Sequence, residues 1–177
     1  GDVALVTDAG MPGISDPGSE LVVAAAEAGF NVEVVPGPSA VTAALALSGF
    51  SGDAFLFLGF LPRRKIDRLA ALREASMSAV PLVLFEAPHR LRATLADLDT
   101  VFGGRQLAVC RELTKLHEEV FRGAAAQALD HFALPRGEVV LVVQGWQAED
   151  SGQPGAGGED EVATELNLRQ MLSDLKE

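Results

Sequence analysis

The sequence predicts an α/β fold in which strands alternate with helices. Short apolar runs recur through residues 1–146, and each is followed by a loop and then by a helical pattern. Of the 177 residues, 48% are hydrophobic, which is enough apolar material for one sizeable core or two small ones. Composition changes at residues 48–53 and again at residue 147. We therefore expect an α/β domain at 1–52, a second α/β domain at 53–146, and an acidic linker with a short helical tail at 147–177.

The first segment has the order strand, loop, helix, strand, loop, helix. Its expected elements are a strand at residues 3–7, a helix at 19–28, a strand at 31–35 and a helix at 39–47 that Ser39 caps. This order is typical of a parallel sheet with helices packed on it. A parallel strand needs neighbours on both sides, and this chain opens with one. We therefore expect that the first domain is incomplete.

The second segment begins after the small residues 48–53 and is also α/β. Strands are expected at residues 54–58, 82–85, 106–110 and 138–143. Helices are expected at residues 63–75, 90–102 and 124–132, and the first of these is basic and amphipathic. Residues 59–62 (GFLP) should break the first strand, and 111–119 form a polar stretch. Residues 147–162 have the composition of a disordered linker, and 164–176 show weak helical spacing.

Charge is distributed unevenly along the chain. The formal net charge of −11 argues against a nucleic-acid partner for the chain as a whole. However, residues 1–50 carry six acids and no lysine or arginine, and residues 148–177 carry eight acids and two bases. Residues 51–147 carry twelve bases and eleven acids. The middle segment therefore holds nearly all the positive charge that could face a polyanion.

Several classes of protein are disfavoured by the sequence. The longest apolar runs are far shorter than the roughly 20 residues that cross a bilayer, so we expect no membrane span. The single cysteine, Cys110, cannot form an internal disulfide, and the N-terminus does not resemble a signal peptide, so a cytoplasmic location is expected. The three histidines lack metal-ligand spacing, so we expect no metal site. The chain has neither a GxGxxG fingerprint nor a Walker lysine.

Two loops of the first segment follow expected strand ends, where open α/β sheets bind ligands. Residues 7–13 (TDAGMPG) include Gly10, which lets backbone approach a ligand, and Asp8, which accepts hydrogen bonds from a hydroxyl or amino group. Residues 36–40 (PGPSA) lead into a helix whose first N–H groups are free to donate. The alternative for each loop is a plain turn with a helix cap.

Two loops of the second segment, residues 85–90 (FEAPHR) and 110–115 (CRELTK), also follow apolar strands and mix acids with bases. The basic side chains that can meet phosphates are Arg63, Arg64, Lys65, Arg90, Arg111 and Lys115. The side chains that can orient or deprotonate a hydroxyl are Glu86, His89 and Glu112. Salt bridges that hold one loop to another are the alternative for both motifs.

Six segments in this order resemble the ribosomal RNA small-subunit methyltransferase I family. They are residues 7–18 (TDAGMPGISDPG), 36–40 (PGPSA), 59–63 (GFLPR), 85–91 (FEAPHRL), 111–115 (RELTK) and 137–143 (GEVVLVV). The resemblance covers about residues 1–146. The first two segments are also similar to the wider tetrapyrrole-methylase superfamily, and the last four are more specific to the ribosomal branch.

This resemblance implies a two-domain tetrapyrrole-methylase-like enzyme of the class III methyltransferase fold, usually a homodimer, with S-adenosyl-L-methionine as cofactor. The enzyme would methylate the ribose 2′-hydroxyl of a cytidine in the decoding region of 16S rRNA. The family's cofactor contacts correspond here to Asp8, Ala9, Gly10, Met11, Ser39, Ala40 and Glu138. The candidate catalytic residues are Glu86, His89, Arg111, Glu112 and Lys115, and the RNA-facing residues are Arg63, Arg64, Lys65 and Arg90.

Two departures from the family pattern lead us to expect a fragment. The family normally begins with a further strand and a glycine-rich loop, and it continues into a small basic C-terminal region. We expect the chain alone to bind the cofactor weakly or not at all and to be inactive. The rival functions are a tetrapyrrole or corrin C-methyltransferase, which would present an apolar trough, and a non-catalytic nucleotide- or RNA-binding module.

Overall fold

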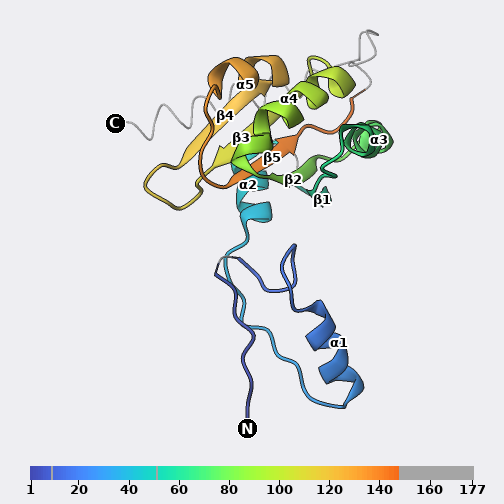
Figure 1. Ribbon diagram of the computed structural model, residues 1–177, viewed down its shortest axis with the longest axis vertical. Coiled ribbons are helices and arrows are strands. Elements are labelled where there is room, and N and C mark those ends of the chain that lie inside the picture. The colour runs from blue at the N-terminus through green and yellow to red at the C-terminus, as the bar shows by residue number, and fades with distance from the viewer. Residues whose placement is uncertain (9, 51, 148–177) are drawn as a thin grey trace, which may run out of the picture. The chain divides into compact units, whose positions relative to one another are not determined.

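The computed structural model describes residues 1–8, 10–50 and 52–147 (Figure 1). The helices are α1 (Ser19–Glu27), α2 (Ala40–Ser48), α3 (Lys65–Ala75), α4 (Pro88–Phe102) and α5 (Ala125–His131). The strands are β1 (Leu56–Phe60), β2 (Leu82–Glu86), β3 (Gln106–Arg111), β4 (Glu119–Ala124) and β5 (Val139–Val143). The α/β class predicted from the sequence is confirmed. The expected linker and helical tail beyond residue 147 lie outside the described residues.

The five strands form one sheet in the order β1-β2-β5-β3-β4. Only β1 and β2 pair in parallel, whereas β5 runs antiparallel to both β2 and β3, and β4 runs antiparallel to β3. No strand directions were predicted for the second segment, and the structure shows a mixed sheet. The reason is that β5 inserts between β2 and β3 in the opposite direction. Because both neighbours are antiparallel to β5, β2 and β3 still point the same way.

Both faces of the sheet are buried, and successive residues alternate between two apolar clusters. Leu84 and Leu141 pack in the cluster that includes residues of α3, α4 and α5. Val83 and Val142, their neighbours in the chain, pack in the cluster that includes α2. Figure 1 shows α4 and α5 on one side of the sheet and α2 on the other. The continuous apolar runs of β2 and β5 follow from this two-sided burial.

Residues 1–39 differ from the expectation of two strands and a helix. The helix forms as α1, one residue shorter than expected, but residues 3–7 and 31–35 are irregular in the structure. Val3 is 88% exposed and Val35 is 87% exposed. The two expected strands are wrong for a physical reason: a strand forms only where another strand pairs with it, and neither segment has such a partner among the described residues.

Smaller corrections concern the second segment. The sequence does not predict β4, because only Val120 and Phe121 of its residues are large and apolar. The strand forms because it pairs with β3 along its whole length. The first strand runs to Phe60 and is not broken at Gly59; an irregularity in its pairing between Phe57 and Gly59 absorbs the glycine, whose φ is 61°. The domain boundary between residues 52 and 53 stays a prediction, although α2 packs against β5 and β3.

Within the described part of the chain, no helix combines the length and apolar character that a membrane crossing requires.

Candidate functional site

The sheet register brings three of the predicted loops to one edge. Glu86, the last residue of β2, and Arg111, the last residue of β3, both lie opposite Val139, the first residue of β5. Glu138, just before β5, therefore lies between the ends of β2 and β3. β1 is parallel to β2, so the loop that carries Arg63 leaves the sheet at the same edge. The predicted second-segment residues thus gather at one place, through a mixed sheet that the sequence did not indicate.

Glu86 is buried at this edge, and its side chain is fully enclosed. Its carboxylate accepts hydrogen bonds from the Ala87 backbone N–H at 2.8 Å and from the Thr94 hydroxyl at 2.5 Å. Arg90 Nε lies 3.3 Å from Glu86 Oε1. Three donors therefore hold the carboxylate in place, and it connects the end of β2 to the first two turns of α4. A carboxylate with these partners holds its neighbours in position.

Two arginines fix the loop after β1 through its carbonyl groups. Arg90 Nη2 donates to the carbonyl of Leu61 at 2.9 Å and to that of Pro62 at 3.3 Å. Arg68 Nη1 donates to the carbonyls of Arg63 at 3.1 Å and Pro62 at 3.5 Å. The expected RNA contact of Arg90 stays a prediction, and in this structure its guanidinium binds protein groups.

Arg68 is itself held by a buried carboxylate of α4. Its Nε and Nη2 atoms lie 2.7 Å and 2.6 Å from Asp97 Oδ2, and both side chains are almost completely buried. With the loop fixed in this way, Arg64 and Lys65 remain 79% and 71% exposed. This pair was not predicted from the sequence. Arg68 stands at helical spacing from buried Leu72 and Ala75, and a charge on an apolar stripe is the signal that could have revealed it.

Lys115, Glu112 and Glu138 form a second cluster at the edge. Lys115 Nζ lies 3.1 Å from Glu112 Oε1 and 2.9 Å from Glu138 Oε2. The backbone N–H of Glu138 donates to Glu112 Oε1 at 2.8 Å, and Glu112 has a left-handed φ of 50°. The N–H of Glu138 and then the Lys115 ammonium hold the pKa of Glu112 below its ordinary value. Glu138 and Glu112 together raise the pKa of Lys115.

Arg111 belongs to a third group, which includes Glu119 of β4 and His131 of α5. Arg111 Nε donates to Glu119 Oε2 at 2.8 Å, and His131 Nε2 lies 2.6 Å from Glu119 Oε1. The hydrogen bond from His131, with a further contribution from Arg111, holds the pKa of Glu119 below its ordinary value. Glu119 was not predicted as a site residue, because β4 was not predicted from the sequence. The salt-bridge alternative weighed for this loop is thus observed for Arg111.

His89 differs from the other candidates. It is exposed in the first turn of α4, and its imidazole has no hydrogen bond or ion pair within the described ranges. It lines a pocket of about 300 Å³ together with Arg92 and residues 133–136. Of the three groups expected to orient or deprotonate a hydroxyl, it alone is not tied to a protein partner in the described part of the chain.

The loops of the first segment approach each other. A Cβ atom on Gly37 would lie 3.5 Å from the Met11 sulfur, so the two loops meet where Gly37 has no side chain. Asp8 is exposed, and Gly10 adopts a left-handed φ of 73°. Ala9 lies outside the described residues. Ser39 occupies the N-cap of α2 as expected, but its side chain makes no capping hydrogen bond, and Ala40 is the first helical residue.

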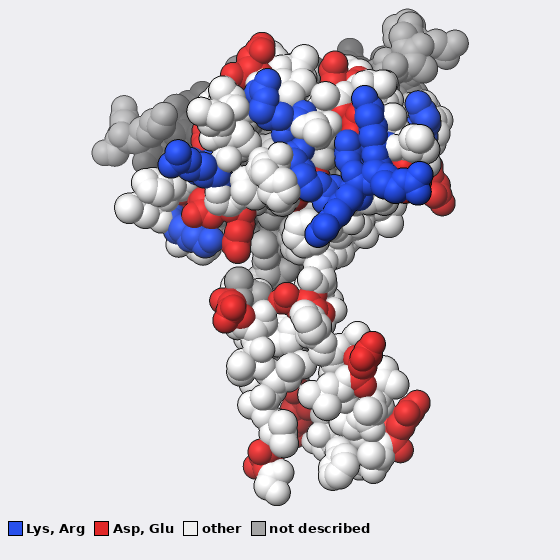
Figure 2. All heavy atoms as spheres, in the orientation of Figure 1, with Lys and Arg blue, Asp and Glu red and all other residues white. Residues whose placement is uncertain are grey.

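Basic side chains gather on the part of the molecule that contains the sheet, as Figure 2 shows. Residues 1–50 contribute six acidic side chains and no basic one. In the described part of the chain, no group of three or more histidine, cysteine or acidic side chains is arranged to hold a metal ion. Cys110 is buried, and burial raises the pKa of its thiol to about 11. At the edge the exposed side chains carry both signs of charge, since Glu138 is exposed as well as Arg64 and Lys65.

Comparison with known proteins identifies relatives of this chain. It is 48% identical to Ribosomal RNA small subunit methyltransferase I of Thermotoga maritima, over 81% of this chain and 65% of the relative. The protein of that name from Halalkalibacterium halodurans is 47% identical, over 81% of this chain and 50% of the relative. The one from Pseudomonas aeruginosa is 42% identical, over 96% and 62%. The chain thus spans between half and two thirds of the length of these relatives.

Solved structures show that the chain shares its fold with known methyltransferases, and a family profile matches most of its residues. The methyltransferase CobJ aligns with a TM-score of 0.59 at 21% identity, over 77% of this chain and 62% of that chain. Uroporphyrin-III C-methyltransferase from Thermus thermophilus, complexed with S-adenosylhomocysteine, aligns with a TM-score of 0.55 at 16% identity, over 76% and 62%. The profile described as Tetrapyrrole (Corrin/Porphyrin) Methylases matches residues 1–129. The predicted resemblance is confirmed, and the chain belongs to the tetrapyrrole methylase family.

Proposed function

We propose that this chain is part of an S-adenosylmethionine-dependent methyltransferase that methylates the 2′-hydroxyl of a cytidine ribose in the decoding region of 16S rRNA. The observation that carries the proposal is the 48% identity to a relative named Ribosomal RNA small subunit methyltransferase I. The exposed basic loop beside the carboxyl ends of the strands supports an RNA substrate, because phosphate contacts dominate affinity for nucleic acid.

The residues of the first segment are suited to a cofactor that carries positive charge. Gly10 leaves room for backbone to approach a ligand, and Met11 lies beside Gly37 of the neighbouring loop. The acidic side chains of residues 1–50 favour a sulfonium or amino cation. We propose that Asp8, Gly10, Met11 and Ser39, with Ala9 and Ala40, bind the cofactor from this side and that Glu138 binds it from the sheet edge. S-adenosylmethionine supplies the methyl group as a sulfonium.

The protein's part in the reaction is alignment of the ribose hydroxyl and removal of its proton. We propose that His89 accepts this proton. The Glu86 side chain is fully enclosed by its three donors and is not accessible to a ribose hydroxyl. The Glu138 N–H and Lys115 lower the pKa of Glu112, which makes Glu112 a poorer base. Arg111 and Lys115 would stabilise negative charge on the hydroxyl oxygen. Arg63, Arg64 and Lys65 would bind phosphates, with Arg90 holding their loop.

Two further properties belong to the proposal. An rRNA substrate favours a cytoplasmic location on the small ribosomal subunit. A homodimer is the expected active form, and the apolar side chains exposed along residues 1–39 provide surface for association. Light scattering at several protein concentrations tests the dimer. A concentration-independent monomer mass would contradict it.

The tetrapyrrole C-methyltransferase alternative shares the fold. The structural neighbours of that kind are 15% to 25% identical, whereas the rRNA methyltransferase relatives are 42% to 48% identical. The charged side chains at the strand ends are also unlike an apolar trough for a macrocycle. A binding module without catalysis is the second alternative, and it would bind RNA equally well with and without the methyl donor.

Calorimetry with S-adenosylmethionine tests the proposal. The titration uses the 177-residue chain and the same chain extended at its N-terminus with the corresponding sequence of the Thermotoga maritima relative. We expect the extended chain to bind and the 177-residue chain to bind more weakly or not at all. If neither binds, the transferase is contradicted and the binding module takes its place. A His89→Gln variant of the extended chain should keep its affinity for the cofactor and lose methyl transfer.

A further inference from the structure

A pocket lies beside α4, and of the residues that line it only His89 has a role in the proposed reaction. It measures about 300 Å³ and is lined by Pro88, His89, Arg92, Ala133, Leu134, Pro135 and Arg136. This size is at the lower end of pockets that hold small ligands. Histidine and two arginines can carry positive charge, leucine and two prolines are apolar, and no lining residue is acidic. The ligand that fits this lining has an anionic group and an apolar face.

The two arginines present their charge in different ways. Arg92 Nη1 donates to the carbonyls of Leu129 at 2.6 Å and Phe132 at 2.9 Å, which fixes the guanidinium at the end of α5. The Arg136 side chain has no hydrogen bond or ion pair to any residue that the structure describes. A guanidinium already held by carbonyls is oriented for an anion, and an unpaired one is available to bind it.

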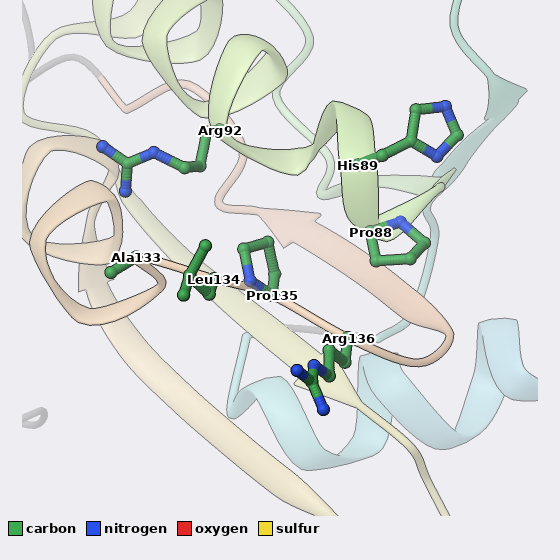
Figure 3. A pocket seen from close by; sticks show the side chains of 7 residues that line it. All are labelled: Pro88, His89, Arg92, Ala133, Leu134, Pro135 and Arg136. Atoms are coloured by element: carbon green, nitrogen blue, oxygen red, sulfur yellow. The ribbon is translucent and has the colours of Figure 1, made fainter.

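Figure 3 shows Leu134 and Pro135 between Arg92 and Arg136, with the His89 ring turned away from them. Leu134 is 88% exposed, so its apolar side chain is available to a ligand that lies between the two arginines. The apolar surface and the two cations together match one nucleotide. Its phosphate would contact the arginines, and its sugar or base would pack on Leu134 and Pro135.

We propose that this pocket binds a nucleotide of single-stranded RNA next to the one that is methylated. The inference rests on the proposed function, because His89, the proposed base, forms part of the same lining. The pocket adds Arg92, Leu134 and Arg136 to the substrate-binding residues. An acidic protein segment is the competing ligand, since it would satisfy the arginines and leave Leu134 unused.

Fluorescence anisotropy of a labelled single-stranded RNA tests the site on the 177-residue chain. The main variant is Arg136→Glu, and the matched control is Arg73→Glu, which reverses the charge of an exposed arginine on α3 outside the pocket. We expect Arg136→Glu to weaken RNA binding on the order of tenfold more than the control does. Its plot of log affinity against log salt should also become shallower, by about 0.7 for each phosphate that the variant no longer neutralises.

A second variant tests the apolar part. Leu134→Ala should weaken RNA binding with no change in salt dependence, whereas Met77→Ala, at another exposed apolar side chain, should have no effect. Polyglutamate of similar charge serves as competitor, and we expect it to displace RNA poorly. Equal RNA affinities for Arg136→Glu and Arg73→Glu, equal competition by polyglutamate, or no RNA binding by the wild type would each overturn the inference. The proposed function is judged separately by the cofactor titration, so the two can fail independently.

Discussion

Residues 1–39 and residues 40–147 share the same kind of sequence but differ in structure. Both have apolar runs followed by glycine- or proline-rich loops and helical patterns. In the second region the runs form β2, β3 and β5 and are buried on both faces. In the first region Val3, Val34 and Val35 are all more than two thirds exposed. An apolar run therefore becomes a strand only when a neighbouring strand pairs with it.

This difference determines what each region can contribute to a site. The edge of the sheet in residues 40–147 is held by buried polar contacts, such as those of Glu86 and Arg68. The first region shows local contacts, such as the hydrogen bond from the Thr7 hydroxyl to Asp16 at 2.7 Å. We therefore expect substitutions of the same kind to destabilise the protein far more in the second region.

The buried ion pair between Arg68 and Asp97 should give the greatest loss of unfolding free energy. Asp97→Ala leaves the Arg68 guanidinium buried without its carboxylate, and we expect the free energy of unfolding to fall by about 3 to 5 kcal/mol. Asp16→Ala, the matched change in residues 1–39, should cost about 1 kcal/mol or less because it removes one half-buried hydrogen bond. Urea unfolding measured by circular dichroism gives both values. Similar losses of unfolding free energy for the two variants would contradict the difference between the two regions.

The next effect concerns apolar packing. Leu141 is fully buried in β5, and Leu141→Ala should lower the free energy of unfolding by about 2 to 5 kcal/mol. Leu21 in α1 is 52% exposed, so Leu21→Ala should change it by less than about 1 kcal/mol. The same urea titration tests both variants. A loss at Leu21 as large as that at Leu141 would mean that residues 1–39 pack in a core in solution.

A smaller effect is expected for two glycines with left-handed backbone. Gly137 has a φ of 80°, and a Cβ atom there would collide with the Glu112 carboxyl group. Gly10 has a φ of 73° and nothing within 4 Å of such an atom. Gly137→Ala should therefore cost about 1 to 3 kcal/mol, and Gly10→Ala should cost less because only the backbone is strained. Equal midpoints of thermal unfolding for the two variants would show that the Glu112 contact adds nothing.

The smallest effect is the pH dependence of Glu119. His131 and Arg111 lower its pKa in the folded state, so its contribution to stability is present above the ordinary value of 4.5 and is lost as the pH falls below it. The wild type should therefore lose more stability between about pH 5 and pH 3 than Glu119→Gln, by up to about 1 kcal/mol. Glu33→Gln neutralises an exposed carboxylate that accepts a hydrogen bond from Asn31, and it serves as the control. Parallel pH profiles for wild type and Glu119→Gln would contradict this contribution.

The features that depend on local sequence pattern, namely helix positions and strand ends, were predicted from the sequence. The helices α1, α2 and α4 lie within two residues of their expected bounds, and the strand ends carry Glu86 and Arg111 as expected. Strand direction and neighbour order depend on contacts between distant residues, so the place of β5 between β2 and β3 was not predictable from periodicity. The same holds for β4, which is ordered by β3, and for the Arg68 and Asp97 pair, which joins two helices.

The sequence indicated which residues belong to the candidate site, but it did not indicate which side chains contact one another there. Glu112 and Lys115 follow the end of β3, as expected, and they contact Glu138 there, which the motif did not indicate. Their ion pairs, and the enclosure of Glu86 by Thr94 and Arg90, depend on side-chain partners that no local pattern specifies. The first-segment residues lie in two adjacent loops, and their role in cofactor binding remains a prediction.

The central claim is methyl transfer to a ribose of rRNA, and the most direct measurement is the transfer itself. The extended chain is incubated with S-adenosylmethionine labelled in its methyl group and with unmodified 16S rRNA, and the RNA is then digested to nucleosides. We predict label in 2′-O-methylcytidine from the decoding region, and no label above background with the His89→Gln variant. Label on a base, or cofactor binding without any transfer to RNA, would contradict the claim.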